Sequence, residues 1–162
     1  MAITIRPATP DDYEGLLQVL RELDEHHLAE HPELFRRPDG PSRAREYIEE
    51  LIQNPDKFLL VAEEAGAVLG FAEGLILRAG NFPVLKPRSW VHLDNIAVLE
   101  ARRGCGIGKL LLAEVRRWAA GRGLSRIELK VYRFNEGARA FYDGQGFREL
   151  SANLFWEAEP GE

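Results

Sequence analysis

The sequence predicts an α/β fold in a single domain, and three observations support this prediction. Segments of strand-like alternation are interleaved with segments of helical periodicity, in the order β-α-α-β-β-β-α-β-α-β. The 162 residues suit one domain, because two domains of half that length would each have a small core. Hydrophobic residues make up 45% of the chain, which is ordinary for a packed globule and too high for a disordered chain. We therefore expect one domain over residues 1–162.

The first third of the chain predicts one strand and two helices. The strand covers Ile3–Ile5, where apolar and polar residues alternate before a proline. Thr9 has the side chain of a helix cap, and leucines at helical spacing continue this helix to about Leu28. Prolines and a glycine then end the helix and predict a loop. A second helix is expected to begin at Ser42 and run through Ile52.

The middle of the chain predicts three strands. Two of them, Phe58–Glu63 and Val68–Leu77, are joined by a tight turn at Ala65-Gly66 and should form a hairpin. A loop with glycine and prolines separates this hairpin from a third strand, Trp90–Val98.

The last third begins with a glycine-rich turn and a helix that places Ile107 and Trp118 on one apolar face. A strand over Arg126–Val131 follows, then a helix over Asn135–Gln145. The chain ends in a strand-like segment, Phe147–Glu157, which we expect to be the last strand of the sheet.

The net charge of −5 conceals a basic segment. Residues 101–130 contain eight Lys or Arg against two Glu, so the rest of the chain is strongly acidic. A short basic segment in an acidic protein indicates a local anion site, whereas nucleic-acid binding would need a wider basic face. A solvated helix face explains Arg116, Arg117 and Arg122 equally well, but it suits Arg102 and Arg103 less because they flank glycines.

The sequence lacks several patterns that would indicate a membrane segment, a secreted protein or a metal site. No apolar stretch reaches the roughly 18 residues that span a bilayer, and residues 1–6 are not a signal peptide, so a cytoplasmic protein without a membrane partner is expected. The lone Cys105 cannot form an internal disulfide or a multi-cysteine metal site. His27 and His31 are four residues apart but lack the glutamate of the H-E-x-x-H motif, so no metal is expected.

A glycine motif, Arg103-x-x-Gly106-x-Gly108, lies between a predicted strand and a predicted helix. Glycines at a helix start let several backbone N–H groups point at one place, which makes an anion cradle, helped by Arg103 and Lys109. The dinucleotide fingerprint would need glycine at 109, and the nucleoside-triphosphate loop would need glycine at 103 and Ser or Thr at 110. Neither fingerprint is present.

With this motif the chain resembles the GCN5-related N-acetyltransferase (GNAT) superfamily. A second element supports the resemblance, Asn135-x-x-Ala138-x-x-Phe141-Tyr142-x-x-x-Gly146-Phe147, and the opening Ile3–Ala8 is also typical of the family. The chain departs from the family pattern at Glu100, Arg102 and Cys105. None of these positions supplies a backbone N–H that is essential for cofactor binding, so the departures do not contradict it. The resemblance spans nearly the whole chain. It implies an α/β sandwich with a mixed, mostly antiparallel sheet, splayed between strands 4 and 5 and flanked by about four helices.

The resemblance also implies that acetyl-CoA is the co-substrate. The diphosphate of coenzyme A would be bound at the glycine loop, by Arg103, Gly104, Gly106, Ile107, Gly108 and Lys109. The pantetheine arm and thioester would be bound by the strand before the loop, at Ile96, Ala97 and Val98, and by Asn135 and Tyr142.

The candidate catalytic residues each have a structural alternative. Tyr142 matches the family position that donates a proton to the departing thiolate, but it could instead be a core aromatic. His92 and Asp94 alternate onto one face of their strand and are candidate bases, or a satisfied polar pair. Glu73 could hold an acceptor ammonium, although an outward-facing polar position is the commoner explanation. Cys105 could carry an acetyl group, but a filler at a variable position is preferred.

The sequence therefore predicts an N-acetyltransferase that transfers acetyl directly to a primary amine. A small-molecule or a peptide acceptor, a water chain as base, and a monomer or a homodimer all stay open. Two other functions also stay open, a coenzyme-A-binding regulatory module without turnover and an acyltransferase for longer acyl groups. The resemblance also implies that the acceptor is chosen by the first two helices and their loop, about residues 22–47, whose acidic and imidazole side chains mildly favour a cationic small amine.

Overall fold

The computed structural model describes residues 2–161, which separate into two compact units. The first unit ends at Lys130 and the second begins at Val131. A single domain over residues 1–162 stays a prediction.

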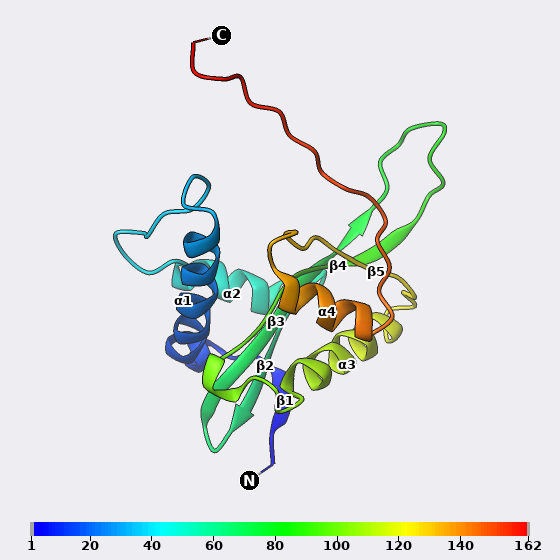
Figure 1. Ribbon diagram of the computed structural model, residues 1–162. Coiled ribbons are helices and arrows are strands. Elements are labelled where there is room, and N and C mark those ends of the chain that lie inside the picture. The colour runs from blue at the N-terminus through cyan, green and yellow to red at the C-terminus, as the bar shows by residue number, and fades with distance from the viewer. Residues whose placement is uncertain (1, 162) are drawn as a thin grey trace. The chain divides into compact units, whose positions relative to one another are not determined.

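A five-stranded sheet runs through the first unit, with its strands in chain order (Figure 1). The strands are β1 (Thr4–Pro7), β2 (Lys57–Glu64), β3 (Ala67–Arg78), β4 (Ser89–Val98) and β5 (Ile127–Leu129). The helices are α1 (Tyr13–Glu30), α2 (Arg45–Gln53) and α3 (Ile107–Ala120), with short 3-10 turns η1 (Pro10–Asp12) and η2 (Glu100–Arg102). Neighbouring strands are antiparallel except β4 and β5, which are parallel. The predicted mixed, mostly antiparallel sheet is confirmed.

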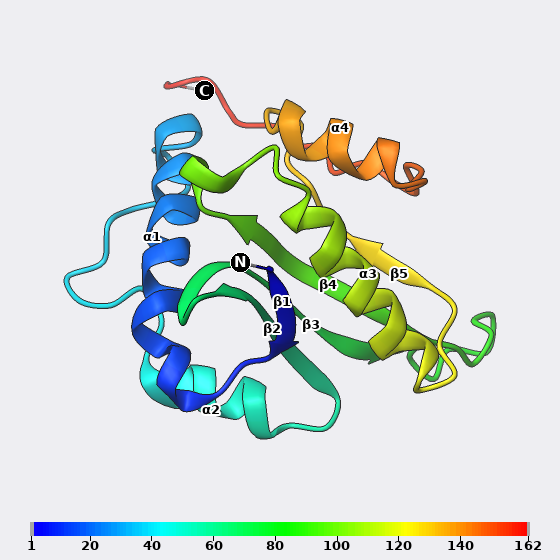
Figure 2. The same cartoon turned by 90° about the horizontal axis from the view of Figure 1, so that it is seen from below.

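Helices cover both faces of this sheet, with α1 and α2 on one side and α3 on the other (Figure 2). Alternate side chains of a strand point to opposite faces, so the sheet feeds two cores. Leu59, Val61 and Phe71 pack with the buried residues of α1 and α2. On the α3 face, the rings of Phe58 and Trp118 are 4.8 Å apart between centroids.

The sheet opens between β4 and β5. Their pairing covers three rungs and ends where Leu93 lies opposite Leu129, whereas β4 continues to Val98. The last five residues of β4 therefore have no partner on the β5 side, and the predicted splay between strands 4 and 5 is confirmed.

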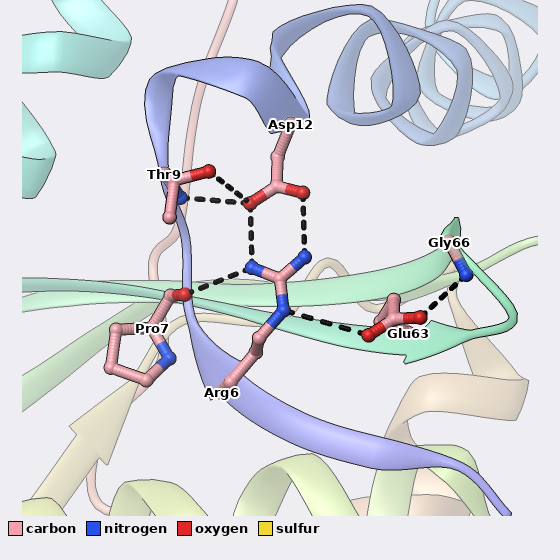
Figure 3. Close-up of polar contacts among 6 residues, drawn as sticks. All are labelled: Arg6, Pro7, Thr9, Asp12, Glu63 and Gly66. Carbon is pink, nitrogen blue, oxygen red and sulfur yellow. Dashed lines mark hydrogen bonds and ion pairs between the residues drawn. The ribbon is translucent and has the colours of Figure 1, made fainter.

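A polar hub ties the start of the chain to the β2–β3 hairpin (Figure 3). The guanidinium of Arg6 donates two 2.8 Å hydrogen bonds to the Asp12 carboxylate, and its Nε lies 3.6 Å from Glu63. Glu63 in turn accepts a 2.6 Å hydrogen bond from the N–H of Gly66, which has φ +83° in the hairpin turn. The hub fixes β1 and η1 on the sheet before α1 begins.

Three elements differ clearly from the sequence prediction. The second helix begins at Arg45 rather than Ser42, and β5 is only three residues long. The predicted strand over Phe147–Glu157 is wrong, since these residues form no helix or strand. Apolar residues at alternating positions indicate a strand only where a partner backbone is available. Here Phe155 and Trp156 are exposed instead of lying on a sheet.

The second unit contains one helix, α4 (Glu136–Gly144), which follows the predicted helix to within one residue at each end. Its end is closed by Gly146, which has φ +87°, a conformation that favours glycine. Among residues 2–161, no helix has the length and apolar character needed to cross a membrane.

Candidate active site

The glycine loop lies between η2 and α3. Gly104 and Gly106 have φ +75° and +82°, and Gly106 is the N-cap of α3. The N–H of Leu110 makes the first bond of the helix, to the Gly106 carbonyl at 3.1 Å, so the preceding N–H groups of the first turn have no acceptor within the helix. A Cβ placed on Gly104 or Gly106 would meet nothing within 4 Å. The loop is therefore an open backbone cradle at the positive end of a helix dipole.

The basic residues near the loop divide into two groups. Arg102 forms a 2.7 Å ion pair with Glu64, so its charge is already compensated within the protein. Arg103 and Lys109 are exposed, and Arg103 Nε donates a 3.2 Å hydrogen bond to the Val98 carbonyl. Only the second group suits the predicted role in anion binding. Cys105 is exposed at the loop, with Sγ 3.8 Å from the Arg103 carbonyl.

The open edge of β4 leads directly into this loop. The N–H of Leu99 donates to the Leu69 carbonyl on the β3 side, and backbone groups alternate between the two edges of a strand. The groups of Ile96 and Val98 therefore face the splay, as the family resemblance implies. Those of Ala97 face β3, and its side chain packs against the core.

A β-bulge breaks the register of β4 at Asp94. Asn95 lies opposite Glu73, and Leu93 lies opposite Gly74, so Asp94 has no residue opposite it. His92 Nε2 is 3.3 Å from Asp94 Oδ1, which places both side chains on one face. Partial burial raises the pKa of Asp94, and the neighbouring His92 and Lys57 counteract this in part.

Glu73 lies beside this pair and is buried, with only 4% of its surface exposed. Its Oε1 accepts a 2.6 Å hydrogen bond from Asn95 Nδ2. Burial raises the pKa of Glu73, and Asp94 adds to the shift. Asn95, Arg43 and Tyr47 oppose it. The interpretation of Glu73 as an outward-facing polar residue is therefore wrong.

The sequence analysis missed two features of this face. Tyr47 on α2 reaches the Glu73 carboxyl, but its helical periodicity gave no sign of contact with β3. The bulge turns the consecutive residues Asp94 and Asn95 to the same face, which strict alternation forbids. The cluster formed by Tyr47, Glu73, His92, Asp94 and Asn95 is called the acidic face below.

The two remaining candidates, Asn135 and Tyr142, lie in the second unit. Asn135 Oδ1 caps α4 by accepting a 3.1 Å hydrogen bond from the N–H of Ala138, and Nδ2 is the atom of this side chain that can donate to a ligand. Tyr142 is buried between the rings of Phe141 and Phe147, at centroid distances of 5.3 and 5.4 Å. Burial raises the pKa of its phenol above the ordinary value.

Two histidines at the end of the first helix, His27 and His31, have partners within the protein. His31 Nδ1 contacts the Glu33 carboxylate, and His27 Nδ1 lies 3.0 Å from the Leu23 carbonyl. Within residues 2–161, no three His, Cys, Asp or Glu side chains are grouped so that they could hold a metal ion.

Comparison with known proteins gives a family match over most of the chain. The model of the acetyltransferase (GNAT) family matches residues 20–147. Mouse thialysine N-epsilon-acetyltransferase is 28% identical over 160 residues, covering 94% of this chain and 88% of that protein. The L-ornithine N5-acetyltransferase NATA1 of Arabidopsis thaliana is 30% identical over 95 residues, covering 59% of this chain. The chain spans only 41% of that plant protein's length.

Solved structures share the fold of this chain. A mutant of the BH1408 protein of Bacillus halodurans superposes with a TM-score of 0.91 at 27% identity, covering 96% of this chain and 99% of that one. The aminoglycoside N-acetyltransferase AAC(6')-Iy in complex with CoA has a TM-score of 0.71 at 20% identity, covering 96% and 99%, which shows a shared fold.

Proposed function

Because the chain belongs to the acetyltransferase (GNAT) family, we propose that it is an N-acetyltransferase that uses acetyl-CoA and acetylates a primary amine of a small molecule or peptide. One observation carries the proposal. The open edge of β4 runs directly into a glycine cradle at the start of α3, and the acidic face lies on the same strand.

The cradle suits a diphosphate. The backbone N–H groups of Ile107, Gly108 and Lys109 lie in the first turn of α3, where the helix dipole favours an anion. The open space at Gly104 and Gly106 lets phosphate oxygens approach the backbone. Arg103 and Lys109 add positive charge from exposed positions. These residues would hold the diphosphate end of coenzyme A.

The splayed edge suits the other end of the same molecule. Acetyl-CoA supplies a thioester whose carbonyl carbon is open to attack by an amine. The backbone groups of Ile96 and Val98 face the splay, where they can pair with the amides of an extended arm. A backbone N–H on this edge would stabilise the negative charge that develops on the thioester oxygen.

Asp94 is the proposed base. An alkylammonium has a pKa near 10.4, so at neutral pH an acceptor amine must lose a proton before it can attack. The pKa of Asp94 is raised by burial, which makes its carboxylate a stronger base than an exposed one. His92 lies 3.3 Å away and orients this carboxylate.

Tyr142 is the proposed proton donor to the departing thiolate, on the strength of its position in the family motif. Burial raises the pKa of its phenol, which is therefore neutral at pH 7 and has a proton to donate. Transfer is proposed to be direct, without an acetyl group on Cys105.

The test is a screen of polyamines, amino acids, aminoglycosides and N-terminal peptides with acetyl-CoA, followed by release of free thiol. We expect thiol release that depends on an added amine, with the acetylated amine detected by mass spectrometry. Competition by longer acyl-CoA thioesters tests the donor. Tight binding of coenzyme A without amine-dependent thiol release from any acceptor would contradict the proposal and favour a regulatory module.

A further inference from the structure

The acidic face carries more negative charge than the proposed reaction needs. Proton removal requires one base, yet Glu73 places a second carboxyl beside Asp94, and the nearby Asp94 raises the cost of charging Glu73. A buried carboxylate is costly unless a cation or several hydrogen bonds compensate it. The proposed reaction alone therefore does not account for Glu73.

Arg43 compensates the charge of Glu73 only in part, because the nearby cations have other acidic partners. Arg43 lies 3.6 Å from Asp24, and Lys57 forms a 2.8 Å ion pair with Glu50. In the part of the chain that the structure describes, no Lys, Arg or His nitrogen forms an ion pair with Glu73. Its hydrogen bond from Asn95 favours the charged form but brings no positive charge. A cation from outside the protein could therefore pair with the Glu73 carboxylate.

Two members of the acidic face are exposed to solvent. Asp94 is half-exposed, and Tyr47 reaches the Glu73 carboxyl while 42% of its own surface stays exposed. The ring of Tyr47 can contact an ammonium group as it enters, because cations are attracted to aromatic faces. Asp94 precedes the residue opposite Glu73, so the Cβ atoms of the two acids should be about 5–8 Å apart, given the usual spacing of cross-strand neighbours.

We propose that Glu73 binds a second, non-reacting ammonium group of the acceptor, so that the enzyme selects amines with two positive charges separated by a short methylene chain. This inference rests on the proposed function, in which Asp94 receives the reacting amine. Glu73 acts in binding and Asp94 in chemistry, which explains why two acids occupy one face.

The test compares 1,4-diaminobutane with n-butylamine, which has the same chain and one charge. Turnover of both is measured for the parent and for Glu73→Gln, which keeps the acceptor oxygen for Asn95. We expect the parent to favour the diamine in kcat/KM by about tenfold to a hundredfold, mostly through KM, as one added charge-assisted contact allows. Glu73→Gln should lose this preference, so that its kcat/KM values for the diamine and for n-butylamine become nearly equal.

Binding provides a second arm that does not need turnover. The same amines are titrated calorimetrically into the parent and Glu73→Gln in the presence of coenzyme A, which carries no acetyl group. Diamine binding that is weakened about tenfold or more only in Glu73→Gln would support the inference even if no amine is acetylated, in which case the proposed function alone fails. Equal binding and turnover of the two amines by the parent, or a diamine preference that survives in Glu73→Gln, would overturn the inference.

The fold of Glu73→Gln is checked by its thermal midpoint and by the shift that coenzyme A induces. Glu49→Gln is the matched control, because Glu49 is a Glu of α2 outside the acidic face, and it should behave as the parent in every assay. A loss of diamine preference in this control as large as that in Glu73→Gln would reduce the effect to general surface charge and overturn the inference.

Discussion

Asn95 Nδ2 donates a 2.6 Å hydrogen bond to Oε1 of Glu73 across the β3–β4 ladder, at the rung next to the bulge. The contact joins the buried acid to the residue that follows Asp94. It therefore fixes the local conformation of the bulge as well as the position of the Glu73 carboxyl. The free-energy penalty of burying the Glu73 carboxyl and the candidate base Asp94 therefore occur side by side in this ladder.

The first prediction concerns that penalty. Burial raises the pKa of Glu73 in the folded protein, so its contribution to stability is present below the pKa of an unfolded glutamate, about 4.3, and is lost as the pH rises through the folded value. Glu73→Gln cannot ionise and should gain stability relative to the parent as the pH rises. Urea unfolding at pH 4 and pH 8 measures this. A difference between the two proteins that does not change with pH would show that Glu73 is charged at no cost.

The second prediction concerns the hub of Figure 3. Hydrogen bonds from Arg6 are the largest cause that lowers the pKa of Asp12, so the stabilisation is complete above about 3.9, the pKa of an unfolded aspartate, and is lost as the pH falls through the folded value. Asp12→Asn should lower the free energy of unfolding by about 1–3 kcal/mol at pH 7 and by less in acid. Denaturant unfolding across this pH range measures both effects.

Asp11→Asn is the control for this prediction, because Asp11 is an exposed neighbour in the same turn. It should change the free energy of unfolding by less than about 0.5 kcal/mol. Equal losses in the two variants would assign the effect to the acidic start of the helix rather than to the Arg6 contact.

The third prediction tests the cradle. Gly106 and Gly66 have nearly the same φ, +82° and +83°, and both have open space where a Cβ would lie, but only Gly106 is in the loop. Valine at either position should cost similar stability, because both force a side chain into a left-handed conformation. Coenzyme A at 100 times its dissociation constant should stabilise the parent by about 2.7 kcal/mol, which raises the thermal midpoint. Only Gly106→Val should lose this rise in the thermal midpoint. An unchanged shift in Gly106→Val would remove the cradle from the proposal.

The sequence predicted most of the sheet because its signals are local. The alternation in Trp90–Val98 and the turn at Ala65-Gly66 each depend on a few neighbouring residues, and the structure has both. The last segment, Phe147–Glu157, was predicted wrongly because its apolar residues say nothing about whether a partner strand is present. Sheet pairing is a long-range property, so periodicity alone cannot decide it.

The acidic face was only partly predictable for the same reason. That His92 and Asp94 share a face followed from alternation, and their 3.3 Å contact agrees with it. Burial of Glu73 and its contact with Tyr47 depend on how α2 packs on β3, which no local pattern encodes. The bulge is also a property of the strand pair and not of one strand.

The fourth prediction concerns the base. Asp94→Asn keeps the shape of the side chain but cannot accept a proton, so kcat/KM should fall by about 10²–10⁴-fold. The loss should be largest at acidic pH, where the least free amine is present and proton removal matters most. A pH–rate profile with the best acceptor measures this. Asp56→Asn, at an acid paired with Arg78 away from the acidic face, is the control and should keep the parental profile. A small loss that is uniform across pH would make Asp94 a structural residue.

The last prediction concerns Tyr142, whose hydroxyl is proposed to protonate the leaving thiolate. A coenzyme A thiol should have a pKa near 8.5 by analogy with cysteine, so protonation helps its departure without being indispensable. Tyr142→Phe keeps the ring contacts with Phe141 and Phe147 and removes only the hydroxyl. We expect kcat to fall by about 10²–10⁴-fold, the usual range for general acid catalysis. Coenzyme A affinity and the thermal midpoint report on packing, and affinity should change by less than about tenfold because the ring stays in place. A parental kcat in Tyr142→Phe, under conditions where the chemical step limits turnover, would make Tyr142 a packing residue and require the proton to come from water or another side chain.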